Sequence, residues 1–168
     1  MKHPKFWARF FLIASIVTAA LIFWFSAQKA VDSQALSDPL TLRVAGILRP
    51  DFIRLPEPDR ISFLDLLSTV IRKSAHFCEF ALLGFCLMGT FRFYFPKRTD
   101  GGCRLRAMAI AVAYAISDEL HQLFVSERAG RVTDVLIDSA GSLTGTFVLT
   151  LCLILFTKLL QRRSAGRE

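Results

Sequence analysis

Carboxylates, imidazoles and guanidiniums are concentrated in a few short stretches of an otherwise apolar chain. His76 and Glu79, for example, stand three residues apart, a spacing that places both on one face of a helix. Groups of these types could transfer protons, bind a phosphate or carboxylate, or hold a divalent ion. The candidate residues of a polar pocket are Lys73, His76, Glu79, Tyr114, Asp118, Glu119, His121, Gln122, Arg128, Arg131, Asp134 and Asp138.

The spacing of these residues narrows the chemistry. It matches no defined zinc motif such as His-Glu-x-x-His, so we expect no metal and no cofactor. No serine or cysteine has an evident activating partner, which leaves the catalytic residues unknown and leaves open whether any reaction is catalysed. The four cysteines show neither metal-ligand nor disulfide-like spacing, and we expect them to be structural.

The elements that would position these residues are long apolar blocks. The chain has 168 residues, of which 53% are hydrophobic, and its charges fall mainly between the blocks. This pattern is typical of a membrane protein, and helices are expected because lipid offers backbone groups no partners. We predict an all-α membrane fold in a single domain, 1–168, with four transmembrane helices at about 7–25, 75–95, 105–124 and 135–157.

The segment between the first two predicted spans is expected to be a long outer loop carrying short helical segments. A short helix should begin at the Asp-Pro pair of 38–39 and run to about Leu48. Proline-containing stretches at 49–50 and 56–58 should break the chain. Residues 61–71 are amphipathic enough to lie on the membrane surface before the second span begins.

The net charge of +7 is also explained by the membrane. A soluble basic protein would suggest nucleic acid, but here the Lys and Arg residues flank the apolar blocks, so we expect no nucleic-acid partner. The charges place both termini and the loop between the second and third spans in the cytoplasm. We expect the protein in the plasma or inner membrane.

With this orientation, every candidate residue lies at the outer end of its helix. A charged side chain at mid-bilayer costs about 2.5–3.5 kcal/mol on insertion scales. The carboxylates should therefore lie near the interface, in ion pairs or in a wet cavity. Lys73, Arg128 and Arg131 are available as partners for four of them, namely Glu79, Asp118, Asp134 and Asp138. Simpler alternatives stay open: His76 and Glu79 as a polar interfacial turn, and Asp134 and Asp138 as helix-dipole partners.

The fourth predicted span carries a Gly-x-x-x-Gly pattern at Gly141 and Gly145. Small residues at this spacing allow close approach of a second helix. We expect Ser142 and Thr144 to form hydrogen bonds across that contact.

Three of these stretches resemble the VanZ-like family, the teicoplanin-resistance protein family. Residues 72–80 resemble its Lys-x-x-His-x-x-Glu-aromatic signature, and 114–124 resemble its Asp-Glu-x-x-Gln stretch. Residues 128–141 resemble its closing Arg, Asp, Asp and Gly block, and 24–28 its first-helix ending. The resemblance implies a small multi-pass membrane protein. The family's named activity is low-level teicoplanin resistance, which the resemblance does not establish for this chain.

The leading hypothesis is a cell-envelope protein with an outward polar pocket between the second, third and fourth helices. Lys73, Arg128 and Arg131 would bind the phosphate or carboxylate of a membrane lipid or lipid-linked envelope intermediate. The acids and imidazoles would supply hydrogen bonds or proton transfer. The alternatives are a structural or partner-binding membrane protein without catalysis, and an ion- or proton-coupled transporter. A homo-oligomer is compatible with each.

Overall fold

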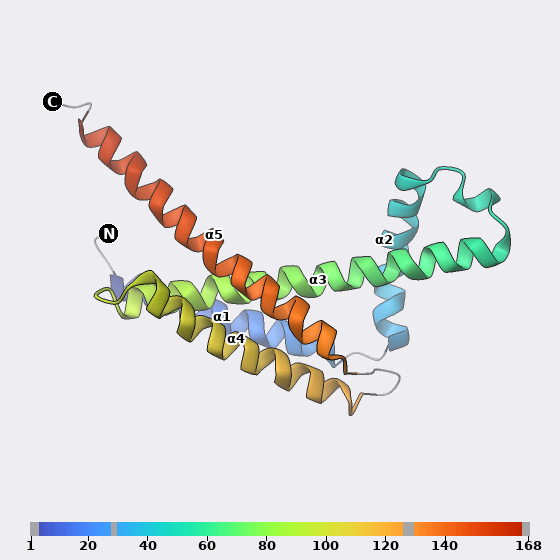
Figure 1. Ribbon diagram of the computed structural model, residues 1–168, viewed down its shortest axis with the longest axis horizontal. Helices are drawn as coiled ribbons and strands as arrows, with labels where there is room; N and C mark the ends of the chain where they lie inside the picture. Colours follow the sequence, from blue (N-terminus) through green and yellow to red (C-terminus); the bar gives the residue numbers. More distant parts are fainter. Residues whose placement is uncertain (1–3, 28–29, 126–129, 166–168) are drawn as a thin grey trace.

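The computed structural model describes residues 4–27, 30–125 and 130–165, with side chains at all of these except 30–37 and 164–165. Over these residues all of the regular secondary structure is helical, and short turns connect the helices (Figure 1). The elements are α1 (Pro4–Ser26), α2 (Ala30–Leu48), the 3₁₀ turn η1 (Phe52–Arg54), α3 (Glu57–Tyr94), α4 (Asp100–Gln122) and α5 (Val132–Ala165).

Helix α3 is the centre of the fold, because α1, α2, α4 and α5 all pack against it. Its 38 residues give a length of about 57 Å, almost twice the ~30 Å hydrocarbon core of a bilayer. Figure 1 shows α1, α4 and the first part of α5 beside the second half of α3, while α2 crosses its first half. The start of α1, the end of α5 and the turn between α3 and α4 lie toward the same end of the structure.

Small side chains allow the helices of the bundle to approach closely. Gly84 on α3 and Gly141 and Gly145 on α5 line one crossing. A Cβ atom at Gly141 would collide with the carbonyl oxygen of Phe77, and one at Gly145 would collide with that of Ala81. The close approach predicted for the Gly-x-x-x-Gly pattern is therefore confirmed. Its partner is α3.

A separate apolar cluster holds α2 to the first half of α3. Ala45, Phe52 and Leu67 are its buried members, contributed by α2, η1 and α3. This cluster lies outside the main core, which is built around Phe80 and Met88. The segment between the first and second predicted spans is thus a folded helical unit and not a plain loop.

Two predicted helix boundaries in this segment are wrong. The surface helix over 61–71 is not separate from the second span, because α3 runs without a break from Glu57 to Tyr94. No proline occurs between Pro58 and the end of that helix, so nothing in the backbone interrupts it. Helix α2 begins at Ala30 and continues through Pro39, whose ring costs it a backbone hydrogen bond without ending it.

Three of the described helices are long and apolar enough to cross a membrane, namely Pro4–Ser26, Glu57–Tyr94 and Val132–Arg163. Helix α4 does not meet that measure. Its first half carries Arg104 and Arg106, and its last turns carry Asp118 and Glu119. Asp118 and Glu119 are both buried, so neither carboxylate faces outward.

Candidate functional site

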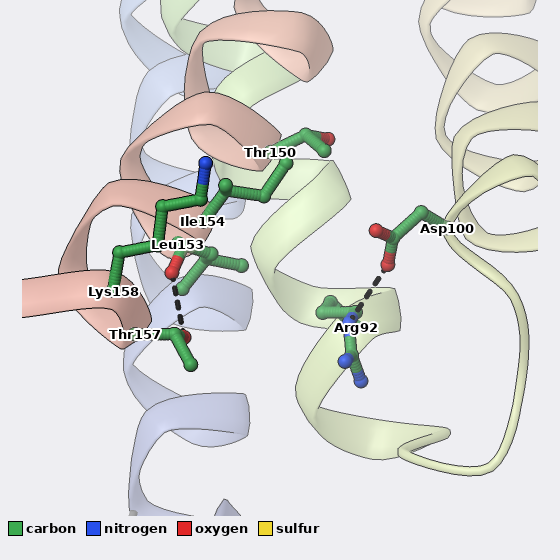
Figure 2. Close-up of a pocket in the computed structure, with 7 residues that line it drawn as sticks. All are labelled: Arg92, Asp100, Thr150, Leu153, Ile154, Thr157 and Lys158. Atoms are coloured by element: carbon green, nitrogen blue, oxygen red, sulfur yellow. Dashed lines mark hydrogen bonds and ion pairs between the residues drawn. The ribbon is translucent and has the colours of Figure 1, made fainter. Parts of the chain in front are cut away.

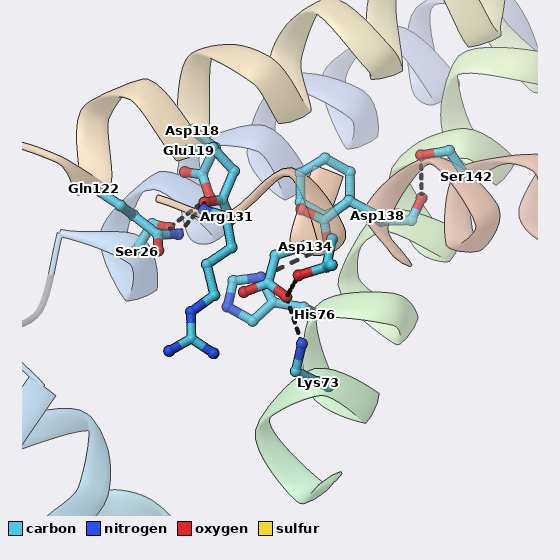
Figure 3. A network of polar contacts seen from close by, with 12 residues as sticks. Ser26, Lys73, His76, Asp118, Glu119, Gln122, Arg131, Asp134, Asp138 and Ser142 are labelled. Carbon is cyan, nitrogen blue, oxygen red and sulfur yellow. Dashed lines mark hydrogen bonds and ion pairs between the residues drawn. The ribbon is translucent and has the colours of Figure 1, made fainter. Parts of the chain in front are cut away.

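The polar residues meet where α1 and α4 end, α5 begins and α3 passes beside them (Figure 3). Ser26 closes α1, and its hydroxyl donates to Asp118 Oδ2 across 2.6 Å. The Gln122 amide donates to both partners, at 2.8 Å to Ser26 Oγ and 3.0 Å to Asp118 Oδ2. All three side chains are buried. This triad ties the end of α1 to the last turns of α4.

A second contact joins the end of α4 to the start of α5. The backbone N–H of Arg131 donates to Glu119 Oε2 at 2.7 Å. Gly130 permits this approach, since a Cβ atom there would lie 2.7 Å from the Glu119 carbonyl oxygen. The guanidinium of Arg131 is exposed and forms no ion pair with any described residue. Figure 3 shows it extending away from the carboxylates.

An ion pair links α3 to the start of α5. Lys73 Nζ lies 2.6 Å from Asp134 Oδ1, with about a third of each side chain exposed. Thr133 also donates to the same oxygen at 3.3 Å. Pairing of Lys73 with one of the carboxylates was expected from the sequence, and the structure selects Asp134 among the four that were open.

The most buried carboxylate is Asp138, with no exposed surface. Neither of its oxygens accepts a hydrogen bond from a described residue. His76 Nδ1 lies 3.9 Å from Asp138 Oδ1, closer than any other basic group described in the structure. An ionised carboxylate without hydrogen bonds is costly in an apolar interior, so the imidazole is the group positioned to share a proton with it.

The remaining candidate residues take different positions. Tyr114 donates its hydroxyl to the Ala19 carbonyl at 2.6 Å and so braces α4 against α1. The His121 ring packs on Phe23 of α1, with 4.8 Å between ring centroids. Glu79 is partly buried on α3 and has no hydrogen bond or ion pair within the described part of the chain. Arg128 lies outside the described residues.

Sequence reasoning missed the part that α1 plays. The pocket was expected between the second, third and fourth spans, whereas Ser26 brings the first helix into the same network. Its signal was a polar residue ending an apolar helix, inside the stretch that resembles the family's first-helix ending. At the α3–α5 crossing, Ser142 does donate across to the Phe80 carbonyl at 3.1 Å. The prediction for Thr144 is wrong, because it is exposed and donates to Ala140 of its own helix.

The chemical capacity of this group follows from its contents. We call the set Ser26, Lys73, His76, Asp118, Glu119, Gln122, Arg131, Asp134 and Asp138 the polar layer. It combines buried acceptors, an imidazole that could relay a proton, and one exposed guanidinium. Among the described residues, no group of three or more His, Cys, Asp or Glu side chains is arranged to hold a metal ion.

Long apolar helices gathered around α3, with buried carboxylates at one end, define a small multi-pass helical membrane protein. A comparison with protein families matches VanZ/LLP1 over residues 11–156, so the chain belongs to that family. Comparisons with curated proteins and with solved structures each found no match.

Proposed function

We propose that the polar layer binds the phosphate-bearing head group of a membrane lipid or lipid-linked envelope intermediate. The observation that carries the proposal is the exposed guanidinium of Arg131. Its backbone is fixed by buried Glu119, while its guanidinium is exposed and forms no ion pair with the described residues. A guanidinium fork binds phosphate or carboxylate oxygens in a bidentate manner, so this side chain suits such a group.

The rest of the layer would position and complement that contact. Lys73 is held by Asp134, so among the described residues of the polar layer Arg131 is the cation available to a ligand. Asp118 Oδ1 is buried and accepts no hydrogen bond from a described residue, so an internal water is the donor that suits it.

The proposal includes four membrane-spanning helices. Asp138 and Lys158 are separated along α5 by about 30 Å, which matches the ~30 Å hydrocarbon core. Helix α4 lies beside α3 and α5 over this depth, and its charged residues stand near its two ends. We therefore propose that α4 is the fourth span, that both termini are cytoplasmic, and that the polar layer lies at the opposite boundary of the plasma or inner membrane.

A structural role without ligand is the second candidate, and the Ser26–Asp118–Gln122 triad favours it. Its hydrogen bonds are internal and buried, as expected of a device that only joins helix ends. The two candidates differ at Arg131, since a purely structural layer has no use for its exposed guanidinium.

The test is lipid binding by the purified full chain in detergent, measured by native mass spectrometry. Phosphatidylglycerol would be compared with phosphatidylcholine for the wild type, Arg131→Ala and Arg54→Ala. Arg54 is an exposed control arginine outside the layer. We expect Arg131→Ala alone to weaken phosphatidylglycerol binding about fivefold. Equal binding by all three proteins would contradict the proposal and leave the structural candidate.

The proposal extends to glycopeptide resistance only through the ligand. If the head group belongs to a lipid-linked envelope precursor, expression of the wild type should change teicoplanin susceptibility, and expression of Arg131→Ala should not. Identical teicoplanin susceptibility with both proteins would show that the Arg131 site has no part in glycopeptide resistance.

A further inference from the structure

A pocket lies at the opposite end of the bundle from the polar layer. It has a volume of about 310 Å³ and opens where the second half of α5 diverges from α3 and α4. Figure 2 shows its seven lining residues, which are Arg92, Asp100, Thr150, Leu153, Ile154, Thr157 and Lys158. Its volume is at the lower end of the range of small-ligand sites.

The pocket joins an apolar wall to charged groups at its rim. Leu153 and Ile154 form the apolar wall on α5, and Lys158 follows about one turn later. Arg92 stands opposite on α3. Two cations and the single carboxylate of Asp100 leave the pocket with a net positive charge. Apolar surface beside excess positive charge is complementary to an acyl chain that ends in an anionic head group.

The hydrogen bonds of the lining residues show which donors are available. The Thr150 hydroxyl donates to the Thr146 carbonyl at 2.9 Å, and the Thr157 hydroxyl donates to the Leu153 carbonyl at 2.8 Å. Both hydroxyl hydrogens are therefore committed to α5 itself. The donors left to a ligand in this pocket are on its two cations.

The two cations are not equivalent. Arg92 Nε lies 2.9 Å from Asp100 Oδ1, and its Nη1 donates weakly to the Pro96 carbonyl at 3.4 Å. Lys158 has no hydrogen bond or ion pair with the described residues, although it lines the same pocket. Lys158 is thus the principal donor, and the second terminal nitrogen of Arg92 can assist it.

The depth of the pocket favours a lipid. Lys158 stands about 30 Å along α5 from Asp138, so the two residues reach opposite boundaries of the hydrocarbon core. Basic residues are frequent in the segments at the Lys158 end, for example Lys5 at the start of α1, Lys97 and Arg98 in the turn between α3 and α4, and Arg162 and Arg163 near the end of α5. Basic pockets between helices at the cytoplasmic boundary are suited to anionic head groups.

We infer that this pocket binds the phosphate of an anionic membrane lipid in the leaflet opposite the polar layer. Lys158 and Arg92 are the residues that contact the phosphate. The inference rests on the membrane boundaries given in the proposed function, but not on its ligand site, because none of the residues that line this pocket belongs to the polar layer.

The test uses the full chain in detergent, titrated with phosphatidylglycerol or phosphatidylcholine and followed by native mass spectrometry. Lys158→Ala should weaken one phosphatidylglycerol-binding event about fivefold, and Lys158→Arg should retain it. Arg162→Ala is the matched control, since it removes an exposed charge from the same helix outside the pocket. Arg131→Ala should leave this event intact, which separates the result from the outer site.

Asp100→Asn is predicted to raise the affinity for phosphatidylglycerol, the opposite of the effect of Lys158→Ala. It removes the pocket's only carboxylate and frees Arg92 Nε, so binding of phosphatidylglycerol should tighten severalfold. A variant that merely loosens the fold would not bind more tightly. Unchanged affinity in both Lys158→Ala and Asp100→Asn would overturn the inference. Displacement of the lipid by an equal concentration of inorganic phosphate would assign the pocket to a free anion and also overturn it.

Discussion

The Ser26 hydroxyl lies 2.6 Å from Asp118 Oδ2, and this hydrogen bond joins residues that are 92 positions apart. It connects the last residue of α1 to the end of α4, with Gln122 bound to both. Because all three side chains are buried, loss of one partner leaves the others without an alternative in water.

This relationship predicts an energetic coupling between Ser26 and Asp118. In a double-mutant cycle, Ser26→Ala and Asp118→Asn should show an interaction energy of about 1 kcal/mol, within the range measured for hydrogen bonds in membranes. The measurement is the free energy of unfolding in mixed detergent. Ser117→Ala is the control, since Ser117 is exposed and donates only to Tyr114 of its own helix. Additive effects of the two substitutions would show that the contact contributes nothing.

The crossing of α3 and α5 predicts a strong dependence on glycine. Gly145→Ala would drive a methyl group into the Ala81 carbonyl, so the free energy of unfolding should fall by about 1–3 kcal/mol. Gly46→Ala is the matched control, because no atom lies within 4 Å of a Cβ built there. Alanine favours the helix over glycine, so the control should be neutral or slightly stabilising. Equal effects at the two positions would contradict the close packing of these helices.

The ion pair between Lys73 and Asp134 should behave as a partly exposed one. Lys73→Glu or Asp134→Lys should each lower the thermal midpoint, and the exchanged double variant should recover most of the loss. The pair itself is expected to contribute no more than about 1 kcal/mol, decreasing as salt is raised. Thermal unfolding at low and high ionic strength measures this contribution. Failure of the exchange to recover stability at low salt would mean that the two side chains do not interact.

The proposed arrangement of four spans predicts which cysteine substitutions a membrane-impermeant reagent can reach. In a background without the four native cysteines, Arg54→Cys and Thr133→Cys should react in intact cells, whereas Lys97→Cys should react only after permeabilisation. All three positions are exposed in the structure, so burial does not decide the outcome. Reaction of Lys97→Cys and Thr133→Cys from the same side would show that α4 does not cross the membrane.

Several features of the fold that depend on local sequence were predicted correctly, whereas most contacts between residues far apart in the chain were not. The apolar blocks predicted helices near their observed positions, because hydrophobic segments of that length form them locally. The role of Ser26 could not be predicted, since it depends on α1 packing beside α4. The separation expected between residues 61–71 and the second span was wrong, because no proline follows Pro58 in α3 and the backbone stays helical to Tyr94. Thr144 was assigned to the wrong face, as its neighbour Ser142 is the one that reaches α3.

For the candidate site, the sequence indicated which residue types to expect together but not which residues contact each other. Residue types and the positions of helix ends were enough to expect carboxylates and cations in one layer. They did not determine the partners, because Lys73 had four carboxylates available and Arg131 contacts Glu119 through its backbone. That second contact leaves the guanidinium exposed, a feature that residue type alone does not indicate.

The most direct measurement is an experimental structure of the full chain in a lipid nanodisc made with phosphatidylglycerol. We predict density for a head group within hydrogen-bonding distance of the Arg131 guanidinium, at the membrane boundary farther from both termini. A guanidinium paired with a carboxylate of its own chain, or facing solvent with no lipid density beside it, would contradict head-group binding by the polar layer.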